Sequence, residues 1–178
     1  PRARSPYGAA KVAARQIVKV WRESYGLYAV QGLLFNHESE RRGEEFVTRK
    51  ITHGVAKIAA NQATSLTLGN LTARRDWGHA RDYVRAMWLM LQQEQPDDYV
   101  IATGRSASVR EFVDMAFAYI GREADDYLVQ DPALMRPSEV PCLEGDTSKA
   151  AHSFDWFPHV CRPPAPSELL ARTSDSRA

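Results

Sequence analysis

The sequence predicts an α/β fold, because amphipathic helical segments alternate with short runs of β-branched and aromatic residues. The first unit is a helix that starts at Pro6, is capped by Ser5 and ends at Gly26, followed by a buried strand within residues 27–35. With 178 residues, 44% of them hydrophobic, the chain can bury one good core or a larger lobe with a small appendage. Helices separate the strands, so at least some of the strand pairing should be parallel.

The segments that follow continue this alternation. The further elements are expected in this order: a helix capped by Thr48, a strand and turn at 65–70, a helix at 79–93, a strand at 99–104, a helix opened by a capping box at 108–111, and a short helix at 149–154. Residues 125–141 are predicted to be irregular, and the proline-rich residues 163–178 are predicted to fray.

The composition excludes several classes of protein. A formal net charge of +1 gives no global field that would favour nucleic acid or an anionic membrane as a partner. The two cysteines, Cys142 and Cys161, have no metal-ligand spacing, which predicts free thiols, no metal and a cytoplasmic setting. No apolar run approaches the roughly 18 residues needed to span a bilayer, and residues 1–5 lack the apolar stretch of a signal peptide.

Tyr7 and Lys11 are the first candidates for catalysis. Four residues apart on a helix, they share one face, and an ammonium close to a phenol favours the phenolate, which can act as a general base. Most pairs with this spacing are ordinary surface residues. Here, however, the run Ser-Pro-Tyr-Gly-Ala-Ala-Lys opens a helix that leads into a buried strand. This arrangement resembles the extended short-chain dehydrogenase/reductase superfamily, whose members bind NAD(P) and mostly act on nucleotide sugars.

A second set of motifs resembles the GDP-mannose 4,6-dehydratase family within that superfamily. The matching segments follow in family order and cover most of the chain from Ser5 to about Val160: LFNHESERRG at 34–43, FVTRK at 46–50, LGNL at 68–71, RRDWGHARDY at 74–83, AMWLMLQ at 86–92, RPSEV at 136–140 and Gly-Asp at 145–146.

The resemblance implies roles for individual residues. Tyr7 would be the catalytic base, assisted by Lys11, which also holds the nicotinamide ribose. The residues implied to bind NADP are Tyr7, Lys11, His37 and Arg42. Those implied to bind GDP-mannose are Asn36, Lys50, Gly69, Asn70, Arg75, Arg136 and Glu139.

The chemistry of these side chains suits the implied roles. The arginines supply planar forks for phosphate oxygens, and Glu139 can accept hydrogen bonds from ribose hydroxyls. Without the resemblance, His37 could equally be a satisfied loop histidine, and Arg41 and Arg42 a solvated charge pair. In the family the arginine-rich loop reaches a neighbouring subunit's cofactor, which implies a homo-oligomer, either a dimer or a tetramer.

The resemblance also implies a domain organisation. The sequence contains no GxxGxxG run for a cofactor pyrophosphate, and the threonine and glutamate that the family uses before its tyrosine would lie ahead of Pro1. The chain is therefore expected to be the C-terminal portion of a dehydratase, without the N-terminal dinucleotide-binding half. Residues 1–36 would be the last part of the Rossmann-like domain, 37–160 a mixed Rossmann edge and smaller substrate-binding lobe, and 161–178 a divergent tail.

The implied reaction converts GDP-D-mannose into GDP-4-dehydro-6-deoxy-D-mannose, a precursor of GDP-fucose, plus water, with NADP as cofactor. The isolated chain is expected to be inactive. Two alternatives stay open from the sequence. One is a non-catalytic remnant that binds GDP-sugars or joins subunits, and the other is an incomplete chain that folds poorly.

Overall fold

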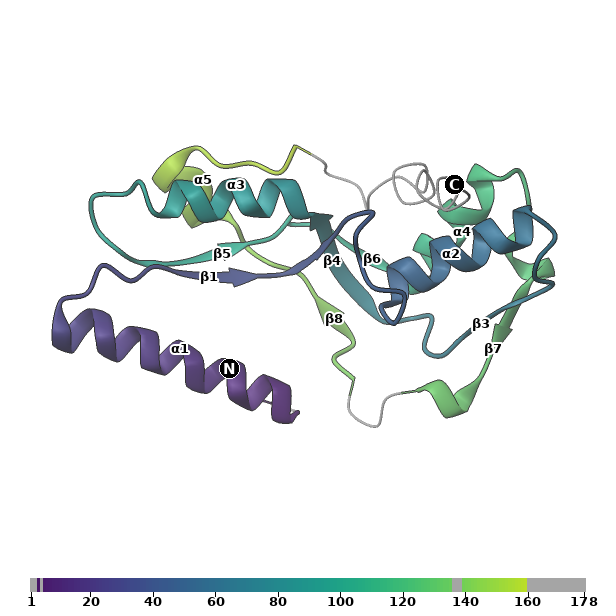
Figure 1. The fold of residues 1–178 in the computed structure, drawn as a ribbon, viewed down its shortest axis with the longest axis horizontal. Coiled ribbons are helices and arrows are strands. Elements are labelled where there is room, and N and C mark those ends of the chain that lie inside the picture. Colours follow the sequence, from purple (N-terminus) through teal and green to yellow (C-terminus); the bar gives the residue numbers. More distant parts are fainter. Residues whose placement is uncertain (1–2, 4, 136–138, 160–178) are drawn as a thin grey trace, which may run out of the picture.

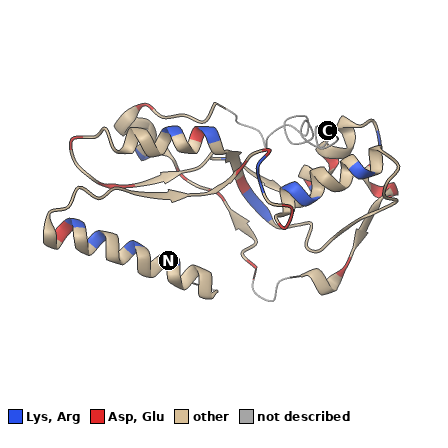
Figure 2. Cartoon of the chain, viewed as in Figure 1, with Lys and Arg blue, Asp and Glu red and all other residues tan. Residues whose placement is uncertain are grey.

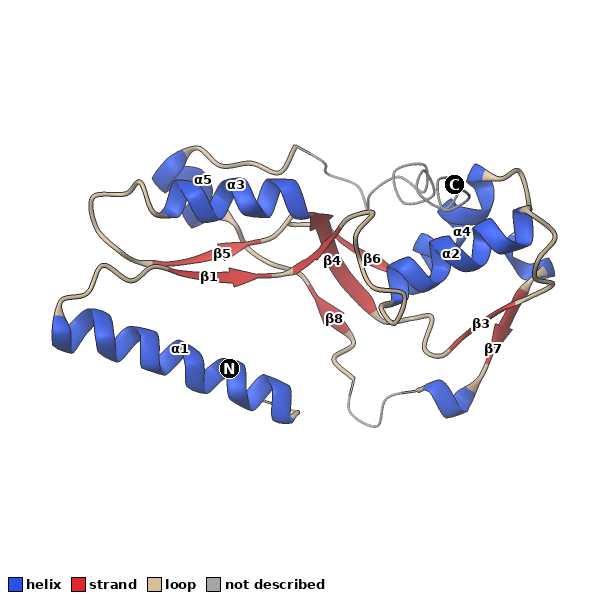
Figure 3. Cartoon of the chain, viewed as in Figure 1, coloured by secondary structure: helices blue, strands red, loops and turns tan. Residues whose placement is uncertain are grey.

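The structure is a computed structural model, and it describes residues 3, 5–135 and 139–159. These residues form small β-sheets flanked by helices (Figure 1, Figure 3). The helices are α1 (Pro6–Tyr25), α2 (Val47–Ala59), α3 (Ala80–Met90), α4 (Val109–Tyr119), α5 (Ser148–Phe154) and the 3-10 turns η1 (Ala124–Asp126) and η2 (Pro132–Leu134). The strands are β1 (Gln31–Leu34), β2 (Asn36–Glu38), β3 (Leu66–Leu68), β4 (Arg74–His79), β5 (Asp98–Ile101), β6 (Ser106–Ser108), β7 (Leu128–Gln130) and β8 (Cys142–Leu143).

The first helix begins and ends where the sequence predicts. The Ser5 hydroxyl accepts a hydrogen bond from the Gly8 N–H at 3.0 Å, and Gly26 ends α1 in the left-handed region at φ 65°. The capping box that opens α4 is also present, with both of its hydrogen bonds between Ser108 and Glu111. These local signals act within one turn of chain, which is why the sequence alone reveals them.

The strand pairing is mostly parallel, as expected. β1 pairs with β5, β2 with β4, β3 with β7 and β4 with β8, all in parallel, while β4 and β6 are antiparallel. Helix α1 lies on one side of β1 and β5, and α3 and α5 lie on the other side (Figure 1). The arrangement is a layered α/β fold.

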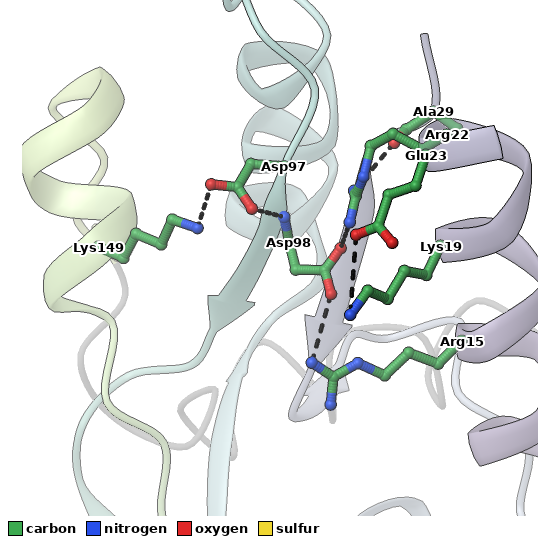
Figure 4. A network of polar contacts seen from close by, with 8 residues as sticks. All are labelled: Arg15, Lys19, Arg22, Glu23, Ala29, Asp97, Asp98 and Lys149. Atoms are coloured by element: carbon green, nitrogen blue, oxygen red, sulfur yellow. Dashed lines mark hydrogen bonds and ion pairs between the residues drawn. The ribbon is translucent and has the colours of Figure 1, made fainter. Parts of the chain in front are cut away.

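Ion pairs attach α1 to this sheet at the start of β5. The Asp98 carboxylate accepts from Arg22 at 2.8 Å and from Arg15 at 3.3 Å (Figure 4). Arg22 also donates to the Ala29 carbonyl at 3.1 Å. None of the residues of α1 is fully buried, and these ion pairs link the helix to the start of β5.

The described residues form two hydrophobic cores, named here core A and core B. Core A joins α2, α4, β3 and one face of β4, and its largest members are Trp77, Phe112, Phe117, Ile51 and Ile58. Core B joins α3, β5 and α5, and its members are Tyr83, Ala86, Met90, Tyr99, Ile101, Ala150 and Trp156. The two cores interleave along the sequence. The chain passes from β5 in core B to α4 in core A, and then returns to core B with α5.

The buried Asp76 carboxylate of β4 connects the two regions. One carboxylate oxygen accepts from the Thr103 backbone N–H and hydroxyl, both at 2.7 Å. The other accepts from the backbone N–H groups of Gly104 at 2.9 Å and Gly145 at 3.3 Å. β4 thus holds the loop after β5 and the loop before α5 against the middle of the molecule.

Several expectations about local structure are wrong. Residues 27–30 lie outside β1, and 36–38, expected beyond the strand's end, form the separate strand β2. Thr48 does not cap α2, because Phe46 occupies the cap position and the buried Thr48 hydroxyl instead donates to Glu38 at 2.7 Å. Residues 125–141, expected to be irregular, contain β7, η2 and the end of η1. The predicted fraying of 163–178 lies outside the described residues.

Candidate functional site

Three of the predicted substrate-binding residues come together on one side of β4. Asn70 follows β3, Arg75 lies on β4, and Glu139 precedes β8. The Asn70 side-chain amide donates to one oxygen of Glu139 at 2.7 Å, and the Arg75 guanidinium donates to the other oxygen at 3.0 Å. We name Asn70, Arg75 and Glu139 the polar triad.

The polar triad is held rigidly by the surrounding backbone. Arg75 also donates to the carbonyls of Arg74 at 2.7 Å and Val140 at 2.8 Å. The Asn70 side-chain carbonyl accepts from the Thr72 N–H and hydroxyl, both at 2.9 Å, which fixes its amide group towards Glu139. The Arg75 and Glu139 side chains are 15% and 21% exposed, so a ligand can still reach them. A guanidinium, a carboxamide and a carboxylate so fixed can recognise phosphate oxygens and ribose hydroxyls.

Gly69 lies directly before the triad, and its position requires a glycine. A Cβ atom there would lie 2.7 Å from the Leu134 carbonyl oxygen, so the turn after β3 can approach η2 only without a side chain. The Gly69 carbonyl accepts from the Gln130 side-chain amide at 3.1 Å. Both contacts fix the turn that presents Asn70. Arg136, predicted to bind substrate nearby, lies outside the described residues.

The predicted substrate residue Lys50 lies on the exposed side of the first turn of α2. That turn has no acidic residue, and its N-terminus has no side-chain cap. Figure 2 shows the basic residues at the start of α2 and on β4. Uncapped N–H groups with a cation beside them favour an anionic group. Asn36 is half-buried on β2, where its register partner on β4 is Trp77.

The predicted cofactor residue Arg42 is folded back on its own chain. Its Nε lies 3.1 Å from a Glu38 carboxylate oxygen, and its guanidinium carbon lies 3.5 Å from the centre of the Phe46 ring. Burial raises the pKa of Glu38, and this effect exceeds the opposing effects of the Thr48 hydrogen bond and the Arg42 charge. The Nε side of the Arg42 guanidinium is therefore engaged by Glu38 within its own loop.

The remaining cofactor candidates are His37, Tyr7 and Lys11. His37 is half-buried on β2 and donates from Nδ1 to the Phe35 carbonyl at 2.8 Å. Tyr7 is 73% exposed on the first turn of α1, and the Lys11 ammonium lies 5.5 Å from the centre of its ring. Phenol, ammonium and imidazole groups fit the ribose and nicotinamide end of a dinucleotide. The sequence offers no glycine-rich turn for its pyrophosphate.

The sequence alone did not reveal several residues that support this region. Glu38, Thr48, Asp76 and Tyr83 are buried. Thr48 donates to Glu38, Asp76 accepts from Thr103, and Tyr83 stacks against His37. One signal could have pointed to Tyr83. Gly78 follows Trp77 inside a strand, and a glycine in a strand often marks a place where another group approaches the backbone closely. Within the described ranges no group of three His, Cys, Asp or Glu residues could hold a metal ion. The same ranges contain no helix long and apolar enough to cross a membrane.

Comparison with known proteins gives consistent matches to one family. A family model described as GDP-mannose 4,6 dehydratase matches residues 1–162. The chain is 55% identical to GDP-mannose 4,6 dehydratase 1 of Arabidopsis thaliana, over 88% of this chain and 44% of the relative. It is 51% identical to the Homo sapiens GDP-mannose 4,6 dehydratase, over 88% of this chain and 47% of the relative. The chain thus spans about half the length of the curated relatives it matches.

Solved structures match the fold at low sequence identity. The structure of RMD from Pseudomonas aeruginosa complexed with NADPH superposes with a TM-score of 0.86 at 22% identity, over 96% of this chain and 57% of that chain. The dTDP-glucose 4,6-dehydratase of Bacillus anthracis in complex with NAD gives a TM-score of 0.84 at 20% identity, over 99% and 54%. The fold is therefore that of the Rossmann-like short-chain dehydrogenases, over slightly more than half of those chains.

One expectation is corrected here. The sequence predicted that the chain is the C-terminal portion of a dehydratase, without an N-terminal dinucleotide-binding half. This prediction is wrong as stated, because the family model matches residues 1–162, which are the N-terminal part of this chain and not its C-terminal end. The family assignment itself is supported by the model and by the relatives. The chain belongs to the GDP-mannose 4,6-dehydratase family of extended short-chain dehydrogenases.

Proposed function

We propose that the chain binds GDP-mannose through the polar triad and contributes to its NADP-dependent 4,6-dehydration. The observation that supports this proposal is the convergence of Asn70 and Arg75 with Glu139, which lies more than 60 residues further along the sequence. Relatives named GDP-mannose 4,6-dehydratase share 46–55% identity with this chain. In this proposal Asn70 and Arg75 bind phosphate oxygens, Glu139 accepts from ribose hydroxyls, and Gly69, Lys50, Asn36 and Arg136 complete the substrate site.

Tyr7 and Lys11 have the catalytic role in this proposal. Tyr7 withdraws the proton from the sugar hydroxyl at C4, and the ammonium of Lys11, one turn away, stabilises the phenolate. NADP, when bound, supplies the redox chemistry. Tyr7, Lys11, His37 and Arg42 would hold it. We expect no turnover from the isolated chain, because its sequence contains no glycine-rich turn for the cofactor pyrophosphate.

A second candidate function is subunit interaction, and the outer side of α1 favours it. Four apolar side chains there are 46–65% exposed: Ile17, Val20, Trp21 and Tyr25. A contiguous exposed apolar surface is typical of a protein contact. We propose a second copy of the chain as its partner, in a cytoplasmic homo-oligomer. Light scattering across a concentration series tests this directly, and a monomer at all concentrations would contradict it.

Calorimetric titration of the chain with GDP-mannose tests the main proposal. We expect saturable binding, and we expect Asn70→Ala and Arg75→Ala to weaken it by about 10- to 100-fold, the loss for one charge-assisted hydrogen bond of about 1.5–3 kcal/mol. Arg110→Ala is the matched control, because Arg110 also pairs with carboxylates but lies on the exposed face of α4. Equal losses for Arg75→Ala and Arg110→Ala would contradict the site.

A further inference from the structure

A close packing arrangement stands behind His37. In the parallel pairing of β2 with β4, His37 lies opposite Gly78. A Cβ atom at Gly78 would lie 2.4 Å from the Tyr83 ring and 2.9 Å from its hydroxyl oxygen. The missing side chain at Gly78 therefore leaves the space that the Tyr83 ring fills, and that ring stacks against His37 with centroids 5.0 Å apart and planes 29° apart.

The Tyr83 ring is fixed from its other side as well. Trp156 meets it edge-on, with centroids 6.3 Å apart and planes at 87°. The Trp156 indole N–H in turn donates to the Asp82 carbonyl at 3.1 Å. Tyr83 is completely buried in core B, so its ring has no room to move away from His37.

The hydroxyl group of Tyr83 does not contribute to this arrangement. It is buried and has no hydrogen-bond partner within the described structure. Burial, together with the charges of Asp76, Asp82 and Glu38, raises the pKa of Tyr83. Tyr83 is thus unsuited to be a second general base, and what it contributes is the face of its ring.

The hydrogen bond of His37 fixes the position of its ring proton. A backbone carbonyl can only accept, so the Nδ1 atom that lies 2.8 Å from the Phe35 oxygen must carry a hydrogen. In a neutral imidazole Nε2 then has a free lone pair. Stacking on Tyr83 holds the ring in the plane in which this bond forms.

We propose that Tyr83 is a positioning residue, which together with the Phe35 carbonyl holds His37 in the Nδ1–H tautomer and makes Nε2 a hydrogen-bond acceptor for a ligand. Such an acceptor selects a hydroxyl or an amide N–H and disfavours a phosphate oxygen. That the ligand is a nicotinamide dinucleotide rests on the proposed function. Under that assignment Nε2 of His37 accepts a hydrogen bond from a ribose hydroxyl or from the carboxamide of the cofactor.

Long-range ¹H–¹⁵N NMR of the full chain tests the proposal, because the correlation pattern of an imidazole distinguishes its two neutral tautomers. The chain has five histidines, and His37→Gln assigns the signal of His37. We expect the Nδ1–H pattern in the ligand-free protein at a pH where the ring is neutral. The Nε2–H pattern would overturn the proposal. Because this measurement needs no ligand, it is independent of whether GDP-mannose or NADP binds.

Two variants test the role of the ring. Tyr83→Phe keeps the ring and should leave the His37 tautomer unchanged, whereas Gly78→Ala displaces the ring and should mix the two tautomers and shift the His37 Cε1 proton. Gly54→Ala is the matched control, because its Cβ would meet only the flexible end of Leu66 in core A. If Gly78→Ala folds and leaves the His37 pattern unchanged, Tyr83 has no positioning role.

Addition of NADP separates this proposal from the proposed function. We expect the Nε2 signal of His37 to move as the nitrogen accepts a hydrogen bond, while Nδ1 stays bonded to the Phe35 carbonyl. The Nδ1–H pattern with no response to NADP would leave the positioning role supported and contradict the cofactor assignment. A response in which Nδ1 loses its proton would overturn the positioning role itself.

Discussion

Asp76→Asn should destabilise the fold severely, because the Asp76 carboxylate is buried and all of its partners are donors. It accepts from Thr103 twice and from Gly104 and Gly145 once each. Asparagine replaces one oxygen with an NH₂ group, so one pair of these donors loses its acceptor. Two hydrogen bonds to a charged group, at about 1.5–3 kcal/mol each, give a loss of about 3–6 kcal/mol. Total stabilities are about 5–15 kcal/mol, so this loss is a large part of the whole.

Urea denaturation followed by far-UV circular dichroism measures this loss. Asp114→Asn is the control, because Asp114 is an exposed carboxylate on α4 that pairs with Arg110 at 2.8 Å. We expect the control to change the free energy of unfolding by less than about 0.5 kcal/mol, as is usual for exposed helix pairs. A loss below about 1 kcal/mol for Asp76→Asn would refute the reasoning, since it would mean that the two hydrogen bonds removed contribute no more than a surface contact.

Two further predictions concern charged groups. Because burial raises the pKa of Glu38 above its ordinary value of 4.5, the folded state binds that proton more tightly, and the stabilisation is present at low pH and is lost as the pH rises through the raised pKa. The urea midpoint of the parent chain should therefore decline as the pH rises above 4.5, and Glu38→Gln should remove this decline. An identical pH profile for the variant and the parent would count against this. Arg22→Ala should cost about 1.5–3 kcal/mol, since Arg22 binds both Asp98 and a backbone carbonyl and its side chain is 14% exposed. Arg15→Ala should cost less than about 1 kcal/mol, because the Arg15 side chain is 36% exposed, and equal unfolding free energies for the two variants would disprove the ranking.

The elements that the sequence predicts are those specified within a few residues. The Ser5 cap, the Gly26 stop and the Ser108 capping box each act inside one turn. β4 was not predicted, because its run of charged residues and a glycine lacks the pattern of a strand. It becomes a strand through pairing with β2, β6 and β8, which come from distant parts of the chain. Tertiary context thus overrides local propensity there.

The same distinction explains the candidate site. No local pattern links Asn70 or Arg75 with Glu139, which lies more than 60 residues further along, and only the family resemblance suggested them. Thr48 resembled a helix cap because it precedes an apolar run. The Thr48 hydroxyl instead donates to the buried Glu38 carboxylate, and the cap position is Phe46, two residues earlier. Pairings across the fold are invisible to reasoning from neighbouring residues.

The interleaving of the two cores has a consequence for synthesis on the ribosome. Every residue of core A has been made once Ala124 has been added, whereas core B waits for Ala150 and Trp156. At about 5–20 residues per second, Trp156 follows Ile101 by roughly 3–11 s. During that time the nascent chain presents Tyr83 without Trp156 and, until Phe154 is made, Tyr99 without its own aromatic partner. Core A can therefore close first, while the residues of core B that have already been made keep apolar surface exposed, and such surface favours aggregation.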